Sequence, residues 1–271
     1  MELVETKLAI VLLDLIGSTK FVQQVGAMKA AKWLQYHDRL ARSLVYKFEG
    51  REIDRSDGFL LSFERPIDAV NFALIYQQTV PLKTKLGCRI GIHWGTIVEV
   101  KQSEIFTVTG AKSIELEGIA KNIAARTMSL CQVLLTIEAM AAIKGRTNHW
   151  TPKGTRYACV GEYRFKGVRE TQIIYAVGST IDSLQPPPSS EKVKRIAGPN
   201  RIKSRMRDRE LREWAWWFTK TLALIISFWL ISILGPIIID PHKRLMSDLD
   251  EWFYWIDPIL VTLQTILEEL L

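Results

Sequence analysis

The stretch IVLLDLIGST, residues 10–19, sets one carboxylate among apolar residues and then breaks into Gly-Ser-Thr. The run Lys7–Leu13 predicts a buried β-strand, and Gly-Ser-Thr predicts the start of a helix. A buried charge is costly unless another group pairs with it. Because Ser18 or Thr19 suits the helix N-cap, the sequence gives Asp14 no structural role. We therefore expect a ligand to supply the partner of this aspartate.

The segments that follow alternate between strand and helix patterns in the order β-α-β-β-α-β. Helical periodicity predicts one long amphipathic helix over 19–48 and a second from Pro66, in PIDAVNFALIYQQ. GREIDRSDGFLLSF (50–63) predicts two short strands around an Asp-Gly turn, and GCRIGIHWGTIVEV (87–100) predicts another strand. A further helix is expected over 119–130, with short strands over 157–165 and 172–177. This order is typical of an α+β, ferredoxin-like sheet with helices on one face, a fold with many unrelated functions.

Composition divides the chain into four parts. Residues 1–180 form the predicted N-terminal domain, and 181–213 form a linker that begins with QPPPSS and becomes basic. A transmembrane helix is predicted over 214–240, and an amphipathic tail over 241–271. Three widely spaced cysteines and four scattered histidines predict neither a disulfide framework nor a zinc site.

The membrane segment rests on 19 consecutive residues without a charge, 221–239. A helix of that length covers about 28 Å, close to the thickness of a bilayer core. Nine Lys or Arg and two acids lie over 192–212, whereas seven acids and two Lys or Arg lie over 240–271. The positive-inside rule therefore predicts a single-pass protein of the cell inner membrane with a cytoplasmic N-terminal domain. The last helix, 252–271, is expected to be interfacial or oligomerising, with a return hairpin as the alternative.

The basic stretch is expected to contact anionic membrane lipid, because it adjoins the span. A nucleic-acid partner is not expected. An RNA-binding sheet presents exposed aromatic side chains on its central strands, and the first strand here is apolar and carries Asp14 instead.

Two aspartates are candidates for a metal site. Asp14 ends the first strand and Asp57 stands in the hairpin turn, which a ferredoxin-like sheet places nearby. Carboxylates in such a pair suit Mg²⁺ or Mn²⁺, although Asp57 alone is also explained by the turn. The backbone N–H groups at the start of the next helix, over Gly17, Ser18 and Thr19, form a candidate phosphate site.

The segment ELEGIAKNIAAR, 115–126, supplies another candidate pair. Asn122 and Arg126 lie four residues apart on the predicted helix and so face the same way. An ordinary surface helix with an exposed arginine is the alternative. The Ile-Ala-Ala sequence between the two residues predicts close packing, which would fix both side chains.

Five motifs together resemble the catalytic domain of class III nucleotide cyclases over residues 5–178. They are LLDLIGSTKF, SDGFLLSF, RIGIHWGTIVEV, EGIAKNIAAR and YRFKGV. The resemblance implies a homodimer with active sites at its interface and two divalent cations, Mn²⁺ or Mg²⁺. One protomer would bind them through Asp14, Asp57 and the carbonyl of Leu15. Its partner would orient the ribose with Asn122, stabilise the α-phosphate with Arg126 and bind the triphosphate with Lys166.

The positions that select the base depart from this family's usual pattern. Adenine-selective members carry Lys with Asp or Thr, and guanine-selective members carry Glu with Cys or Ser. Here Ile53 and Glu115 stand at these positions. Ile53 cannot hydrogen-bond a base, whereas Glu115 could accept from N4 of cytosine or N3 of uracil. Strand parity makes Arg55 a second candidate donor, with a solvated hairpin arginine as the favoured interpretation.

With the compact domain and the membrane segment, these departures resemble the bacterial pyrimidine cyclases of Pycsar anti-phage systems. The resemblance implies that UTP, favoured over CTP, is cyclised to cyclic UMP or cyclic CMP, and that a separate effector responds to the product. A membrane-tethered adenylate cyclase is the first alternative. A catalytically inactive, cyclase-like scaffold that binds nucleotide is the second.

Overall fold

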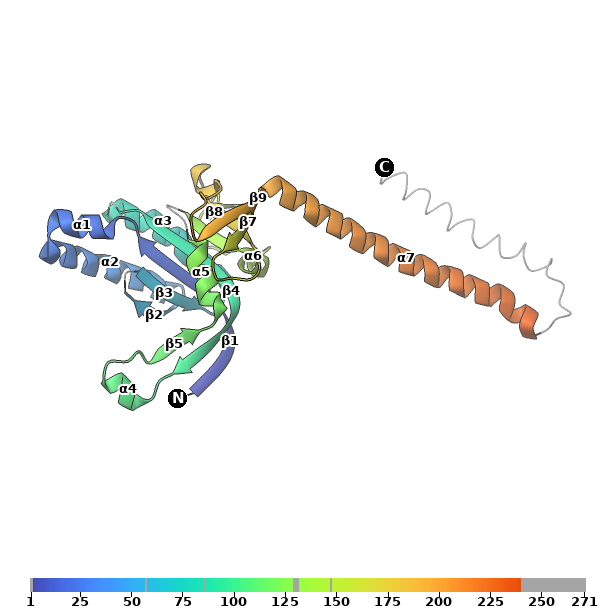
Figure 1. The fold of residues 1–271 in the computed structure, drawn as a ribbon, viewed down its shortest axis with the longest axis horizontal. Coiled ribbons are helices and arrows are strands. Elements are labelled where there is room, and N and C mark those ends of the chain that lie inside the picture. Colours follow the sequence, from blue (N-terminus) through green and yellow to red (C-terminus); the bar gives the residue numbers. More distant parts are fainter. Residues whose placement is uncertain (1, 57, 85, 129–131, 147, 240–271) are drawn as a thin grey trace. The chain divides into compact units, whose positions relative to one another are not determined.

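The computed structural model describes residues 2–56, 58–84, 86–128, 132–146 and 148–239 (Figure 1). The strands are β1 (Glu2–Leu15), β2 (Arg51–Arg55), β3 (Gly58–Phe63), β4 (Cys88–Lys101), β5 (Ile114–Glu117), β6 (Val133–Thr136), β7 (Arg156–Phe165), β8 (Gln172–Gly178) and β9 (Val193–Ala197). The helices are α1 (Ser18–Val25), α2 (Ala27–Lys47), α3 (Pro66–Thr84), α4 (Glu104–Val108), α5 (Ile119–Thr127), α6 (Ile137–Ile143) and α7 (Pro199–Ile239), with a 3₁₀ turn, η1 (Asp182–Leu184). The chain forms two compact units, residues 1–204 and 205–271.

The predicted α+β fold is confirmed. The described strands form one sheet in the order β2-β3-β1-β4-β6-β8-β7-β9, with β5 also paired to β4. The first four strands pair antiparallel as in a ferredoxin-like sheet, and β4 pairs parallel with β6. The sheet therefore contains the predicted βαββαβ core and extends it on the β6 side.

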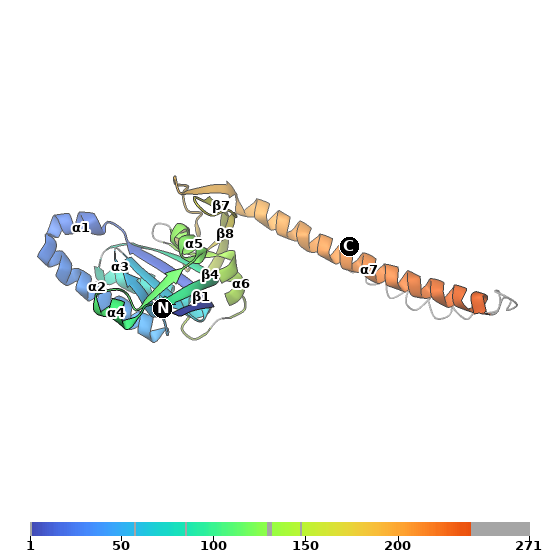
Figure 2. The ribbon, with the colours of Figure 1, turned by 60° about the horizontal axis from the view of Figure 1, so that its bottom comes forward.

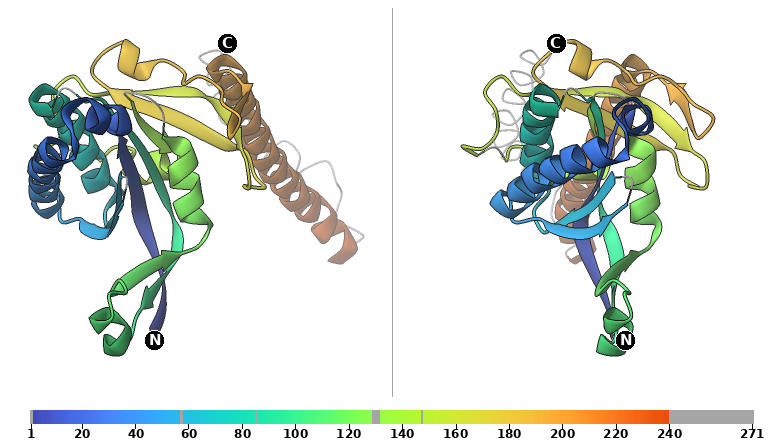
Figure 3. Two further views of the ribbon diagram at one scale, coloured as in Figure 1. Left: turned by 60° about the vertical axis from the view of Figure 1, so that its left-hand side comes forward. Right: turned by 90° about the vertical axis from the view of Figure 1, so that its left-hand side faces the viewer.

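Side chains alternate along β1 between two hydrophobic layers. Ala9, Val11 and Leu13 belong to a core built with residues of α2, α3 and α6. Leu8 and Ile10 point to the other face, where residues of α5 pack. Figure 3 shows α5 and the α2–α3 pair on opposite sides of the central strands. The expectation that the helices of the βαββαβ core cover one face is therefore confirmed, while α5, which follows the core, covers part of the other face.

The single helix predicted over 19–48 is two helices. Gly26 separates α1 from α2 with φ 82° and ψ 153°, a conformation that glycine adopts without the steric cost of a Cβ atom. Figure 2 shows the bend between the two helices. Helical periodicity continues across the break, which explains why the sequence pattern did not reveal it.

The segment predicted as a linker over 181–213 begins as part of the folded domain. The 3₁₀ turn η1 lies in it, and β9 pairs antiparallel with β7 at the edge of the sheet. The Gln132 side-chain amide donates to the backbone carbonyl of Gln185 at 2.6 Å, which fastens the segment to β6. The strand sequence VKRIA is rich in basic residues, and this composition concealed its strand pattern.

An arm projects from the sheet where β1 begins and β4 ends (Figures 1 and 3). The N-terminal half of β1 pairs with the C-terminal half of β4, which continues through α4 into β5. Three large apolar side chains of α4 are exposed to solvent: Ile105, Phe106 and Val108. The arm thus presents apolar surface outside the described core.

In the second unit, the described residues form one helix, the C-terminal part of α7. Its segment Leu211–Ser232 is long and apolar enough to cross a membrane, with none of its most hydrophobic window buried inside the protein. This range overlaps the predicted span over 214–240. The tail over 241–271, including the helix predicted over 252–271, lies outside the described residues.

Candidate active site

Asp14 lies near the end of β1, directly opposite Arg89 of β4. Arg89 donates to one carboxylate oxygen of Asp14, with Nη2 at 2.6 Å and Nε at 3.1 Å. The carboxylate is 21% exposed and the arginine side chain 43% exposed. The expectation that Asp14 has no partner within the chain is therefore wrong. Arg89 stands in the motif RIGIHWGTIVEV, but only the register of β1 against β4 reveals the pair.

The predicted hairpin after Arg51 is confirmed as β2 and β3, but Asp57 lies outside the described residues. Gly58, the residue after it, is the β3 partner of Asp14 across the strands. A Cβ atom on Gly58 would overlap the backbone carbonyl of Leu13. Gly58 therefore permits the close approach of β3 to β1.

The chain passes from β1 into α1 through Gly17, which adopts a left-handed conformation at φ 77°. Leu15 is buried at the end of β1, and Ser18 and Thr19 form the first turn of α1. No side chain caps this helix start. A helix start without a side-chain cap leaves its first N–H groups free of side-chain acceptors.

Arg126 and Asn122 lie on α5 as predicted, but their surroundings differ. Asn122 is exposed, whereas Arg126 is half-buried and its Nε atom is buried without a hydrogen-bond partner among the described residues. The helix packs closely on β4, since a Cβ atom on Gly91 would overlap the carbonyl of Ala124. The predicted close packing is thus present, and it fixes the stem of Arg126 but not Asn122.

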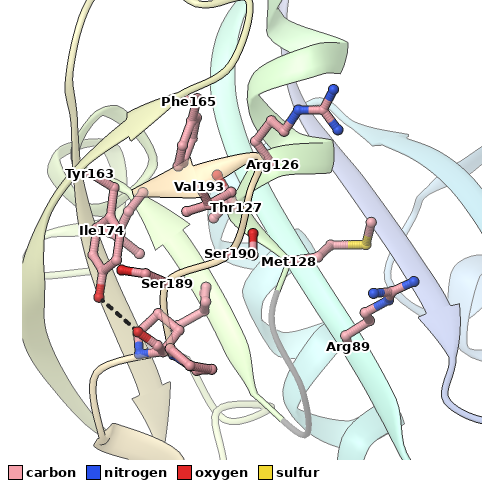
Figure 4. Close-up of a pocket in the computed structure, with 13 residues that line it drawn as sticks. Arg89, Arg126, Thr127, Met128, Tyr163, Phe165, Ile174, Ser189, Ser190 and Val193 are labelled. Atoms are coloured by element: carbon pink, nitrogen blue, oxygen red, sulfur yellow. Dashed lines mark hydrogen bonds between the residues drawn. The ribbon is translucent and has the colours of Figure 1, made fainter. Parts of the chain in front are cut away.

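A cavity of about 270 Å³ lies beside the C-terminal end of α5. Its wall includes Arg89 and Arg126, with further residues from β7 and from the segment before β9. Figure 4 shows the two arginines on the same side of the cavity, opposite Tyr163. The Tyr163 hydroxyl donates to the carbonyl of Pro187 at 3.4 Å, and burial raises its pKa to about 12. The segment before β9 therefore closes the wall opposite the two guanidinium groups.

Lys166 follows β7 at a turn formed with Gly167, whose φ is 83°. Its side chain is 68% exposed, with Nζ at 3.7 Å from a carboxylate oxygen of Glu191. The preceding residue, Phe165, lines the cavity beside Arg126. Lys166 thus stands at the rim of this region with a long side chain in solvent.

Ile53 and Glu115 face different sides of their strands. Ile53 is buried in the layer that contains Leu116 and the helix α5. Because side chains alternate along a strand, Glu115 points to the face opposite its neighbour Leu116. Within one protomer the two candidate selectors therefore do not converge.

Arg55 does not share the side of Ile53 that strand parity predicts. The register of β2 against β3 shifts between Glu52 and Asp54, which is the mark of a β-bulge. Beyond the bulge, Arg55 contacts α2, where its Nη2 lies 3.1 Å from a carboxylate oxygen of Asp38. Arg55 is an ion-paired, largely buried side chain, so the interpretation as a solvated hairpin arginine is wrong. The shared face with Ile53, which was the support for a base donor, is absent.

Among the described residues, a set that omits Asp57, no three metal-ligating side chains of His, Cys, Asp or Glu gather in one place. Asp14 and the Leu15 carbonyl are therefore the described parts of the predicted metal site. Asp14 itself has a partly exposed carboxylate whose described partner is the accessible side chain of Arg89. Its chemistry suits a hard divalent cation.

No protein-family model and no curated protein sequence matches this chain. Its structure is similar to that of the adenylyl cyclase CyaB from P. aeruginosa, with 16% identity and a TM-score of 0.58 over 68% of this chain and 100% of that chain. The guanylate cyclase domain of RhGC from Catenaria anguillulae, solved in complex with GTP, is 15% identical, with a TM-score of 0.54 over 66% of this chain and 98% of that one. An adenylate cyclase structure from Trypanosoma brucei is 17% identical, with a TM-score of 0.53 over 70% of this chain and 94% of that chain. The chain thus has the fold of nucleotide cyclase catalytic domains.

Proposed function

We propose that this protein is a membrane-anchored nucleotide cyclase that converts UTP, or alternatively CTP, to the 3′,5′-cyclic monophosphate and pyrophosphate. The observation that carries the proposal is the placement of Asp14, which in the fold of nucleotide cyclases lies on the same side of the sheet as α5. Along β1, Leu8 and Ile10 point toward α5, and Asp14 has the same parity. When two protomers pair these faces, the carboxylate of one and the arginine of the other can serve opposite ends of a triphosphate.

Asp14, Asp57 and the carbonyl of Leu15 would hold two divalent cations, Mg²⁺ or Mn²⁺. When bound, such ions lower the pKa of the ribose 3′-hydroxyl and neutralise the charge that develops on pyrophosphate. Arg89 would have to leave Asp14 for an ion to bind. Its side chain is free to do so, because it is 43% exposed and held at this pair by a partly solvated contact.

The remaining candidate residues would bind and orient the nucleotide. The 3′-oxygen attacks the α-phosphorus, the bond from phosphorus to the β-phosphate oxygen breaks, and the hydroxyl proton passes to solvent. Arg126 would donate to the α-phosphate as negative charge develops there. Asn122 would hydrogen-bond the ribose, and Lys166 and the N–H groups over Gly17, Ser18 and Thr19 would bind the phosphates.

We propose that the active enzyme is a homodimer in which Asn122, Arg126 and Lys166 act on the nucleotide bound by the partner's aspartates. Asn122 is exposed on α5 and has no hydrogen bond within the described chain, as expected of a side chain that faces a partner. The exposed apolar residues of α4, Ile105, Phe106 and Val108, support the same proposal.

The choice of a pyrimidine rests on Ile53 and Glu115. Ile53 packs against apolar neighbours and offers no hydrogen bond to a purine edge. The fold itself does not choose a base, because the similar structures include adenylyl and guanylyl cyclases. Glu115 would reach the base across the dimer, since it does not face Ile53 within one protomer. UTP is favoured over CTP by the resemblance to Pycsar cyclases alone.

Turnover of the four nucleoside triphosphates tests the substrate. The full chain, purified in detergent, is incubated with Mn²⁺ and each labelled nucleotide in turn, and the cyclic products are separated. We expect cyclic UMP or cyclic CMP as the main product. Turnover of ATP alone would support the membrane-tethered adenylate cyclase instead. Absence of any cyclic product, with nucleotide binding retained, would support the inactive scaffold.

The cellular setting is part of the proposal. Leu211–Ser232 would anchor the protein in the inner membrane, with the catalytic domain in the cytoplasm where nucleotides are available. The cyclic nucleotide would act as a second messenger on a separate effector during anti-phage defence. Expression of the protein with its genomic neighbour, followed by phage challenge, tests this role. Equal phage resistance in an Asp14→Asn strain would contradict it.

A further inference from the structure

The edge of the sheet formed by β7 and β9 is unusually basic. We call this surface the basic edge, and define it by eight exposed side chains: Arg164, Lys166, Arg169, Lys192, Lys194, Arg195, Arg201 and Lys203. The same stretches, 162–170 and 191–203, contain three carboxylates. Among the described residues, Lys166 is the member of the basic edge that forms an ion pair. The positive charge of this surface is thus largely uncompensated within the domain.

The pairing of β7 with β9 brings two of these positive charges side by side. Arg164 of β7 and Lys194 of β9 are direct Cα partners in an antiparallel pair, so their side chains project side by side from one face. Like charges in this position destabilise a sheet. Neither residue has an ion pair within the described part of the chain. An anionic surface that contacts both would relieve the repulsion.

The basic edge also carries an exposed apolar side chain. Ile196 of β9 is 41% exposed and has no partner on β7, because the register shifts there and Ala197 pairs with Glu162. The face of β7 that carries Arg164 is opposite the one where Tyr163 and Phe165 pack against Ile123 of α5. Cations around an exposed isoleucine match the interface of an anionic bilayer, which offers phosphate groups above and hydrocarbon below.

The sequence limits how far this surface can lie from the proposed membrane segment. Lys203 precedes Leu211, where the apolar segment begins, by eight residues. Even a fully extended chain of that length reaches at most about 28 Å. Lys203, at one end of the basic edge, therefore lies within about 28 Å of the start of the membrane segment.

We propose that the basic edge docks on the anionic leaflet from which the membrane helix emerges, through Arg164 and Lys194. This inference rests on the proposed membrane anchor. Docking would orient the sheet on the bilayer through β7 and β9, and leave the arm and α5 clear for a second protomer. The surface is distinct from the predicted nucleotide-binding residues, except that Lys166 stands at its margin.

Hydrogen exchange of the full chain in nanodiscs tests the proposal. The discs contain either zwitterionic lipid alone or zwitterionic lipid with phosphatidylserine. We expect the amides of 163–169 and 193–197 to exchange severalfold more slowly on the phosphatidylserine discs, and this protection to disappear in high salt. Equal exchange on the two kinds of disc would overturn docking. Co-elution of the chain with the discs is scored separately, so that failure of the anchor and failure of docking are distinguishable.

Lys194→Glu provides a variant whose result cannot be attributed to misfolding. It removes two charge units from the basic edge and creates an attractive pair with Arg164, so the sheet should be no less stable. We expect it to lose the lipid-dependent protection. Lys29→Glu/Lys32→Glu, a control on exposed residues of α2, should retain it. Protection that survives in Lys194→Glu, or that is lost equally in the control, would overturn the proposal.

Discussion

The two faces of the sheet differ in whether their polar and charged side chains are paired within the fold or accessible to solvent. One face is covered by α2, α3 and α6 over a large apolar core, and its polar side chains near β1 are paired within the fold. The other face is covered in part by α5 and carries Asp14, Arg89 and Arg126 around accessible space. The contrast separates residues whose substitution should change stability from those whose substitution should change turnover.

Asp14→Asn should give the largest effect on the α5 face. If Asp14 binds metal, turnover should fall at least about 10³-fold, because metal stabilisation of the transition state is worth several kcal/mol. The free energy of unfolding should change by less than about 1 kcal/mol, since the Asp14–Arg89 pair is partly exposed. Cyclic-nucleotide assays and chemical denaturation measure the two quantities. If this variant fails to fold, Asp14 is needed for stability, and the proposed difference between the two faces is wrong.

Arg126→Lys should give the next largest effect. Lysine keeps the charge but not the planar group, and loss of one positioned donor to developing charge lowers turnover by about 10²- to 10³-fold. Arg39→Lys makes the same change on an exposed position of α2 and should leave turnover unchanged. Initial rates at saturating nucleotide measure both variants. An equal loss in the two would mean that Arg126 has no special place in the site.

The sequence predicts those features of the fold and the site that depend on local patterns, and does not predict those that depend on contacts between distant segments. The βαββαβ order and the positions of Asp14, Asn122 and Arg126 depend on local periodicity, which a sequence displays. The Asp14–Arg89 pair depends on register between strands 75 residues apart. Strand parity places Arg55 on the wrong face because one bulge in β2 reverses the parity. The sequence does not reveal strand β9 because its lysine and arginine residues are equally typical of a linker.

The face covered by α2, α3 and α6 is the closed face, and acid pH should destabilise it before it affects the chemistry of the α5 face. His37 is buried there, with one ring nitrogen 2.6 Å from the Tyr76 hydroxyl and the other 2.9 Å from Asp38. Burial lowers the pKa of His37 below 6.5, and nearby Arg55 lowers it further, although Asp38 opposes the shift. The unfolded chain therefore binds more protons as pH falls below about 6.5, and stability declines.

Urea denaturation between pH 7.5 and 5 measures this dependence. Burial likewise lowers the pKa of His93, beside Thr136, so both buried histidines contribute in the same direction. His37→Gln should reduce the slope of unfolding free energy against pH, whereas substitution of the exposed His149 by Gln should not. If His37→Gln leaves the slope of unfolding free energy against pH unchanged, protonation of His37 does not cause the loss of stability at acid pH.

The smallest expected effect comes from the part of the closed face that no described helix covers, where Arg164 and Lys194 face each other. Lys194→Glu should raise the free energy of unfolding by about 0.2–1 kcal/mol, because a repulsive cross-strand pair becomes attractive. For a unit of this size that corresponds to at most about 4 °C in Tm. Arg164→Glu/Lys194→Glu restores a like-charge pair and should return stability to the wild-type value, which a double-mutant cycle measures. If Lys194→Glu stabilises the protein in detergent but not on phosphatidylserine discs, the wild-type pair is relieved by lipid. A gain of the same size in both settings would mean that the repulsion is never relieved, and that the basic edge faces water.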